Sequence, residues 1–166
     1  MVEGARQRIG FRRRREGRTD YRRRLRLLRS GMPRAVVRKS LNQTRVQVVA
    51  YGDRGDRVVA SAVSGELEAF GWTVGTGNVP AAYLTGLLAG RRATQKGVKE
   101  AVLDLGVQPP SAGGRLFAAA KGLIDAGLAV PHGEGVSPSP ERIRGAHLSE
   151  AVARQFADVK AKVEVA

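Results

Sequence analysis

The sequence contains no cysteine, and its 166 residues include only 2 histidines. Without cysteine the chain can form neither disulfides nor thiolate metal sites, and it has no cysteine nucleophile, which is typical of a reducing, cytoplasmic environment. His132 and His147 lie apart from each other and from clusters of acidic residues, so neither a histidine metal site nor a Ser-His-Asp relay is indicated. We therefore expect no metal and no cofactor.

Long apolar runs are also missing. No stretch approaches the roughly 20 apolar residues of a membrane span, and the first residues, from Met1 to Arg6, contain no apolar signal-peptide core. We expect a soluble protein that is not secreted and has no membrane partner. The hydrophobic fraction of 42% is enough for one buried core in a chain of this length.

Positive charge is abundant and unevenly distributed. The formal net charge is +14; residues 1–45 hold 16 arginines and lysines against 3 acidic residues, a net charge of +13, and residues 46–166 carry only +1. This division predicts a polycationic arm and a nearly neutral body. We place the arm at residues 1–33, the body at 34–148 and a C-terminal helix or tail at 149–166. A polyanion is the partner that this charge indicates.

The arm consists of arginine rather than lysine. Four arginines at residues 12–15 are followed by six more between residues 18 and 29. Guanidinium groups make paired hydrogen bonds to phosphate oxygens and stack on bases, whereas lysine acts mainly as a point charge. Phe11 and Tyr21 flank the run, and their rings can stack on unpaired bases. These features favour structured RNA over a solvated tail, a targeting signal or a lipid-surface segment.

Local patterns predict how the arm is built. Residues 1–18 lack periodic hydrophobicity and carry repelling arginines, so we expect them to be extended or disordered without a partner. A short helix is predicted near residues 20–30, with Thr19 or Asp20 as its N-cap and Gly31 after its end.

Three β-rich runs follow, at residues 34–41, 45–51 and 57–63. Their short connectors contain glycine, asparagine and aspartate, which predicts an antiparallel meander. Polar side chains interrupt the valines of these runs: Arg38, Lys39, Arg45 and Gln47. They fit an ordinary half-exposed sheet face and an RNA contact surface equally well.

The rest of the chain alternates between helices and strands. The expected order is a helix at 80–95, a strand at 100–105, a helix ending near Gly127, a short strand at 128–131, and weaker helices at 140–148 and 150–159. Helices that alternate with strands connect parallel strands and cover sheet faces, so the body is predicted to be α/β. Gly86 and Gly90, four residues apart, predict that the first of these helices packs closely on the sheet.

A glycine-rich turn, Gly75-Thr76-Gly77-Asn78, precedes the helix predicted at 80–95. Such a turn can present backbone N–H groups to a phosphate, or it can be purely structural, and both interpretations stay open. It is not the dinucleotide-binding fingerprint, because Pro80 occupies the place of the third glycine.

The layout of three antiparallel strands followed by alternating helices and strands is also that of two-metal nucleases of the ribonuclease H type. Their chemistry requires converging carboxylates that hold the metals. The first predicted strand has none and offers Arg38 and Lys39 instead, and of the later acids only Asp104 lies inside a predicted strand. We expect no enzymatic activity. A nuclease and a membrane-surface protein remain the alternative classes.

Several segments, in order along the chain, resemble one known family. They are Phe11–Tyr21, Arg24-Leu25, Leu27-Leu28, Arg38-Lys39-Ser40, Gln47-Val48, Thr76-Gly77-Asn78, Pro80–Gly86, Val102-Leu103-Asp104 and Arg144-Gly145-Ala146-His147. Over residues 10–148 the chain resembles the universal large-subunit ribosomal protein eighteen in its archaeal and eukaryotic form, the family that binds 5S ribosomal RNA (5S rRNA).

The resemblance implies a ribonuclease H-like α/β body with a mixed sheet and no nuclease activity. It also implies binding to 5S rRNA in the central protuberance of the large ribosomal subunit, and contacts with 23S rRNA and with the neighbouring 5S-binding ribosomal protein five. Together with the charge pattern, it predicts these RNA-binding residues: Phe11, Arg12, Arg13, Arg14, Arg15, Arg18, Thr19, Tyr21, Arg22, Arg23, Arg24, Arg26, Arg38, Lys39, Ser40, Arg45, Gln47, Thr76, Asn78, Arg144 and His147.

Overall fold

A four-stranded mixed sheet forms the centre of the computed structural model, which describes residues 9–165. The strands are β1 (Arg34–Lys39), β2 (Thr44–Ala50), β3 (Arg57–Val63) and β4 (Val102–Asp104). Their order in the sheet is β3-β2-β1-β4; β1, β2 and β3 pair antiparallel, and β4 pairs parallel to β1. The predicted meander and the α/β class with a mixed sheet are confirmed.

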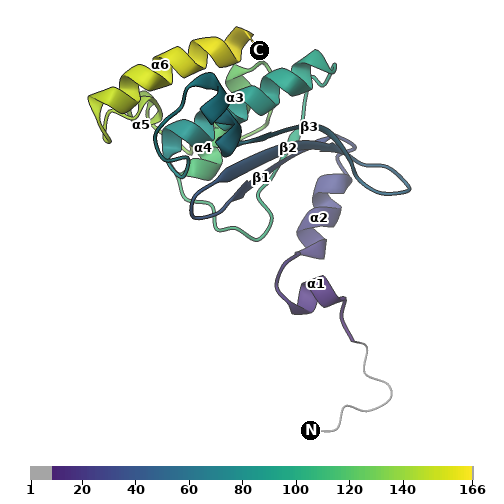
Figure 1. The fold of residues 1–166 in the computed structure, drawn as a ribbon. Coiled ribbons are helices and arrows are strands. Elements are labelled where there is room, and N and C mark those ends of the chain that lie inside the picture. Colours follow the sequence, from purple (N-terminus) through teal and green to yellow (C-terminus); the bar gives the residue numbers. More distant parts are fainter. Residues whose placement is uncertain (1–8, 166) are drawn as a thin grey trace, which may run out of the picture.

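Helices cover one face of this sheet (Figure 1). The inner layer contains α3 (Val79–Gln95) and α4 (Arg115–Asp125), and α6 (Glu150–Val165) packs on α3 as an outer layer. A 3-10 helix, η1 (Ser64–Phe70), follows β3, and the short α5 (Pro140–Arg144) precedes α6. Among residues 9–165, none of these helices combines the length and the apolar character needed to cross a membrane.

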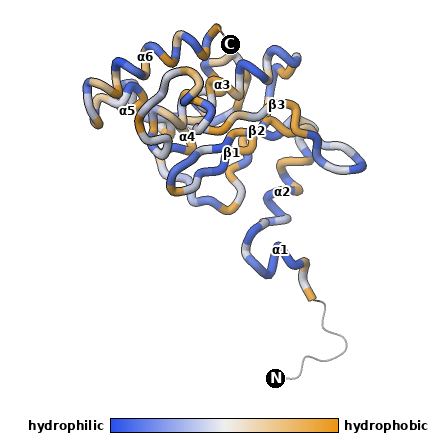
Figure 2. Tube along the Cα trace, viewed as in Figure 1, coloured by the Kyte–Doolittle hydropathy of each residue, from blue (hydrophilic) through white to orange (hydrophobic). Residues whose placement is uncertain are grey.

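Alternation along the strands decides which face the helices cover. Ala35 and Val37 of β1 and Val46 and Val48 of β2 are fully buried. Side chains of successive strand residues point to opposite faces, so these apolar residues define the helix-covered face. Residues that alternate with them, such as Val36, Arg38 and Gln47, are partly exposed on the other side, which we call the open face. Figure 2 shows apolar stretches along the strands and a hydrophilic α1.

The helices α3 and α4 are in backbone contact. A Cβ atom added to Gly86 would overlap the carbonyl group of Ala119, and one added to Gly122 would overlap the carbonyl oxygen of Tyr83. Gly90 likewise faces α4. The prediction that Gly86 and Gly90 pack a helix on the sheet is therefore wrong, because both glycines bring one helix against another.

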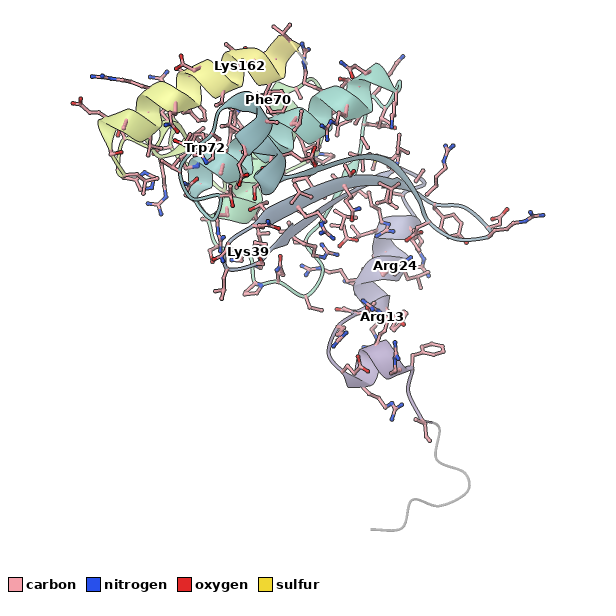
Figure 3. All side chains as sticks on the ribbon, viewed as in Figure 1. Arg13, Arg24, Lys39, Phe70, Trp72 and Lys162 are labelled. Carbon is pink, nitrogen blue, oxygen red and sulfur yellow. The ribbon has the colours of Figure 1, made fainter. Side chains whose placement is uncertain are left out.

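Three C-terminal elements differ in length from their predictions. The helix expected at 140–148 ends at Arg144, because Gly145 takes a left-handed conformation that ends the helix. The expected strand at 128–131 does not form: Ala129 makes only an isolated bridge to Glu100, and Pro131, which has no N–H, cannot extend the pairing. The helix predicted at 150–159 continues to Val165. Its extra turns are held because Val163 is buried and because Lys162 donates a hydrogen bond to the carbonyl oxygen of Phe70 (Figure 3).

The arm projects from the body on the open-face side of the sheet (Figure 1). It contains α1 (Arg12–Arg15) and α2 (Tyr21–Leu28). The expectation that residues 1–18 are extended or disordered is wrong at α1, where Glu16 forms ion pairs with Arg12 and Arg18 and so reduces arginine repulsion; residues 1–8 lie outside the described residues.

The second arm helix matches its prediction. The side chain of Asp20 accepts hydrogen bonds from the backbone N–H groups of Arg22 and Arg23, so Asp20 is the N-cap. The hydrogen bond from Arg23 lowers the pKa of Asp20, which keeps this cap ionised. No residue of α2 is fully buried; Leu27 and Leu28 are partly buried, and polar contacts with the body also hold the helix in place.

Candidate nucleic-acid interface

Two consecutive arginines attach α2 to the body. The Arg24 guanidinium lies 2.7 Å from a carboxylate oxygen of Asp56, in the turn between β2 and β3. The Arg23 side chain donates a 2.8 Å hydrogen bond to the carbonyl oxygen of Gly106, just after β4. Figure 3 shows Arg24 on α2 below the sheet and Arg13 farther along the arm. The arm helix thus rests between two loops that follow different strands.

Asp104 is surrounded by arginines on the open face. The side chain of Arg34 donates to one carboxylate oxygen at 2.7 Å, and that of Arg38 donates to the other at 3.1 Å. Only 6% of Asp104 is exposed. Burial raises the pKa of its carboxyl, but the charge of Arg38 and the hydrogen bonds from Arg34 and the Gly106 N–H outweigh this effect and lower the pKa. Asp104 is therefore an ionised structural anchor.

A cleft of about 380 Å³ lies between the arm and the β1–β4 edge. Its arginines come from the arm and from β1: Arg13, Arg18, Arg23, Arg24, Arg34 and Arg38. The acidic side chains in its lining are Asp20, which caps α2, and Asp104, which pairs with two arginines. Because these carboxylates are already engaged, the cleft presents positive charge to a ligand.

A second hollow, of about 320 Å³, lies beside the first on the open face. It is lined by Arg38, Lys39, Ser40, Gln43, Arg45 and Gln47. The strand register places Arg38 directly opposite Arg45. Like charges in opposite positions destabilise a sheet, and an anionic ligand between them would remove the repulsion. The structure therefore brings together five of the predicted residues, all of those on β1 and β2 and in the turn between them.

Arg38 lines both the cleft and the hollow. The two hollows therefore form one basic surface, which runs from the arm helix across β1 to β2. Lys39 lies at the far end of this surface in Figure 3. The side chain of Gln108 fixes that end, since it accepts from the Lys39 N–H at 3.0 Å and donates to the Lys39 carbonyl at 2.6 Å.

The aromatic rings of the arm also face solvent. The ring centroids of Phe11 and Tyr21 are 5.3 Å apart at an angle of 52°, and Phe11 is 72% exposed. The arm arginines that form no ion pair with any described residue include Arg14, Arg15, Arg22 and Arg26, all exposed. Arg13 is held differently, through a 2.9 Å hydrogen bond to the Thr19 hydroxyl.

The glycine-rich turn before α3 has a structural role. The Thr76 hydroxyl donates to the carbonyl oxygen of Asn42 at 2.7 Å, and the Asn78 side chain caps α3 by accepting from the Ala81 N–H at 2.8 Å. Gly77 is required because a Cβ atom there would lie 2.7 Å from the carbonyl oxygen of Leu41. These contacts attach the start of α3 to the β1–β2 turn. An RNA contact by Thr76 or Asn78 stays a prediction.

Arg144 and His147 lie elsewhere. Both are exposed at or just after α5, which is far from the arm in Figure 1. His147 lines a separate hollow of about 400 Å³ together with Arg142. The structure does not bring these two predicted residues to the basic surface, and any RNA contact that they make would be a second one.

Comparison with known proteins identifies the family. Residues 5–101 match the family model described as "Ribosomal large subunit proteins 60S L5, and 50S L18". Large ribosomal subunit protein uL18 of Natronomonas pharaonis is 57% identical over 90% of this chain and 82% of its own length. The uL18 proteins of Haloarcula marismortui and Methanococcoides burtonii are each 53% identical over 90% of this chain, covering 80% and 87% of their own lengths. The chain belongs to this family.

Membership decides between the classes that the sequence left open. The uL18 proteins are structural constituents of the large ribosomal subunit, so the prediction of a non-enzymatic, RNA-binding ribosomal protein is confirmed, and the alternatives of a nuclease and a membrane-surface protein are not supported. In the structure, Asp104, the acidic residue singled out inside a predicted strand, pairs with Arg34 and Arg38. Residues 9–165 contain no group of three or more side chains suited to hold a metal ion.

Sequence reasoning missed the residues that position the predicted arginines. Arg34 and Asp56 were interpreted as the start of a strand and as part of a turn, although they form a 2.6 Å ion pair. Gln108 was not singled out at all. No periodic signal links these residues, because the pairs that they form span 22 and 69 positions. The one clue in the sequence is an arginine at the start of a valine-rich strand, Arg34, because an arginine that becomes buried needs an acidic partner.

Proposed function

We propose that this ribosomal protein binds 5S rRNA and anchors it in the central protuberance of the large subunit of cytoplasmic ribosomes. The arm and the open face act as one RNA-binding surface, and neighbouring parts of the protein contact 23S rRNA and ribosomal protein five. The observation that carries the proposal is the position of Arg38, which joins the arm cleft to the hollow on the open face.

The two parts of the surface make different contributions to binding. Arginines of the arm neutralise phosphates, and Phe11 and Tyr21 offer exposed rings to unpaired bases. The hollow around Arg45 belongs to a rigid sheet. Phosphate contacts from a rigid sheet fix the orientation of a bound RNA more than they read its sequence. The arm supplies most of the affinity, and the sheet fixes the position and orientation of the bound RNA.

A binding experiment tests this function. The full chain is titrated with 5S rRNA and with an unrelated RNA of equal length at several salt concentrations. We expect clearly tighter binding to 5S rRNA, with an affinity that falls steeply as salt rises because each neutralised phosphate releases counterions. Equal affinity for the two RNAs would reduce the protein to a general polycation and refute the specific proposal.

The finer partners need a separate experiment. The chain is isolated from its own cells with its bound molecules, and the RNA and proteins are identified by sequencing and mass spectrometry. We expect 5S rRNA as the principal RNA, together with 23S rRNA and ribosomal protein five. Large-subunit particles that contain the chain but have 5S rRNA bound only by other proteins would contradict the anchoring role.

A further inference from the structure

We propose that two acidic residues of the RNA-binding side, Asp56 and Asp104, raise RNA affinity because they position arginines. Their charge alone predicts the opposite, since a carboxylate repels phosphate. The inference rests on the proposed RNA-binding function, but it concerns how the surface is held ready for RNA. Neither residue is part of the predicted set of RNA-binding residues.

The two carboxylates belong to one chain of ion pairs. Its members alternate in charge, in the order Arg24, Asp56, Arg34, Asp104 and Arg38, at successive distances of 2.7, 2.6, 2.7 and 3.1 Å. Each carboxylate is therefore shared by two guanidinium groups. The chain begins on the arm helix α2, passes through the β2–β3 turn and β4, and ends on β1 at the residue that joins the two hollows.

Burial differs between the middle and the ends of this chain. The side chains of Arg34 and Asp104 are only 5% and 8% exposed, whereas those of Arg24 and Arg38 are 39% and 40% exposed. Charge interactions are stronger where water is excluded, so the middle is rigid. The two end arginines keep unused N–H donors at the surface, because a guanidinium has five. They are oriented by the carboxylates and remain available to phosphate.

The arm helix depends on this chain for its position. No residue of α2 is fully buried, although Leu27 and Leu28 are partly buried, and its polar links to the body among the described residues are the Arg24–Asp56 ion pair and the hydrogen bond from Arg23 to the Gly106 carbonyl. Loss of the Asp56 charge would leave α2 freer to move. A mobile arm must lose conformational entropy when RNA orders it, and this cost lowers affinity. Asp56 is therefore a positioning residue that acts through Arg24.

The decisive variant is Asp56→Asn, and the chain offers a matched control. Asp53 lies in the same turn, is exposed, and forms no ion pair with any residue in the described range 9–165. Asp53→Asn removes the same charge, so on electrostatics alone both variants should bind RNA slightly more tightly. We expect Asp53→Asn to follow this rule and Asp56→Asn to bind 5S rRNA about tenfold more weakly, the order of effect of one charge-assisted hydrogen bond.

Two further measurements separate positioning from a general loss of structure. Asp56→Glu keeps the charge and should restore part of the affinity. The double variant Arg24→Ala/Asp56→Asn should bind 5S rRNA about as weakly as Arg24→Ala alone, because the two side chains act as a pair. Without RNA, trypsin should cut the α2 arginines faster in Asp56→Asn than in Asp53→Asn. The urea midpoint of Asp56→Asn should fall as well, because Asp56 also pairs with the buried Arg34, so RNA binding is compared under conditions in which circular dichroism shows both variants fully folded.

The outcomes are distinguishable. Weaker binding and faster arm cleavage in Asp56→Asn, both absent from Asp53→Asn, would support the inference. Affinity in Asp56→Asn equal to or above that of the unaltered chain would overturn it, whatever the cleavage rate. If the unaltered chain failed to prefer 5S rRNA, the proposed function would fail, yet the affinity of the two variants for any RNA that the chain binds would still decide the role of Asp56.

Discussion

The carbonyl group of Ala119 in α4 occupies the space that a Cβ atom on Gly86 of α3 would need. The two helices therefore approach as closely as their backbones allow. Gly122 in α4 makes the reciprocal contact with the carbonyl oxygen of Tyr83. Because α3 and α4 together cover the sheet, the distance between these two helices determines how the core packs on the face opposite the open face.

Replacement of Gly86 by alanine should destabilise the protein strongly. Both atoms in conflict belong to backbones or to a Cβ, and neither can rotate away, so we expect a loss of about 3 kcal/mol or more in the free energy of unfolding. Gly75→Ala is the control, because Gly75 has no atom near its added Cβ and has an ordinary φ. Urea unfolding should show an effect only at Gly86; equal midpoints for the two variants would mean that the helices can separate at little cost.

Asp104 should contribute stability that depends on pH. Its pKa lies below the usual 3.8 in the folded state, so the contribution is fully present above 3.8 and is lost as pH falls through the lowered pKa. Asp104→Asn should lower the free energy of unfolding by about 3 kcal/mol at neutral pH. This is the lower end of the effect of breaking a buried ion pair, because Arg34 would still pair with Asp56.

Urea midpoints at several pH values would check this prediction. The difference between the unaltered chain and Asp104→Asn should be constant from about pH 5 to pH 7 and should shrink below about pH 4. Asp158→Asn, an exposed change on α6, should leave the curve unchanged. A difference that persists at low pH would show that the lost stability comes from packing rather than from the ionised carboxylate.

The sheet could be predicted from the sequence because its information is local. Alternating apolar residues such as Val46 and Val48 define one buried face, and short polar turns define the hairpins. The predicted cluster of Arg38, Lys39 and Arg45 came from the same strands, and the structure places these residues in one hollow.

Long-range partners could not be predicted in this way. The spacing of Gly86 and Gly90 indicated a close approach but not what is approached, because a helix and a sheet can both accept a bare backbone. Arg34 and Asp104 are 70 positions apart and meet only once β4 has paired with β1. The arm's attachment through Asp56 was missed for the same reason.

Removal of the arm should separate RNA affinity from folding. Deletion of residues 1–30 is preferable to a cut after Pro33, because the Pro33 carbonyl accepts a hydrogen bond from the Val102 N–H at the β1–β4 edge. The deleted part holds 12 arginines against 3 acidic residues, a net charge of +9. We expect circular dichroism of a folded α/β domain, loss of most affinity for 5S rRNA, and a salt slope reduced by roughly 0.7 to 0.9 for each lost phosphate contact.

Replacement of Arg12 to Arg15 by alanine should show the same trend on a smaller scale. These residues are exposed, so the melting temperature should stay nearly unchanged, in line with a stability effect below about 0.5 kcal/mol. If the truncated chain kept its full affinity and salt slope, the sheet rather than the arm would be the main site of RNA binding.

The last prediction concerns the share of binding that belongs to the open face. Arg45 is exposed, forms no ion pair with another described residue, and lies opposite Arg38 in the register. Arg45→Ala should remove one phosphate contact and weaken 5S rRNA binding about tenfold, which corresponds to about 1.4 kcal/mol. It should also relieve the repulsion with Arg38, so the free energy of unfolding should stay the same or rise slightly.

Arg154→Ala provides the matched control for charge. Arg154 is 82% exposed on α6, on the helix-covered side, and its 3.5 Å pair with Glu150 is too exposed to add much stability. Both variants lower the net charge by one, so long-range attraction to RNA changes by a similar amount in each. Because only Arg45 lies in the hollow, a tenfold loss in Arg45→Ala with near-normal binding in Arg154→Ala would assign the effect to a local contact. Equal losses would mean that the open face acts through its net charge and makes no contact of its own.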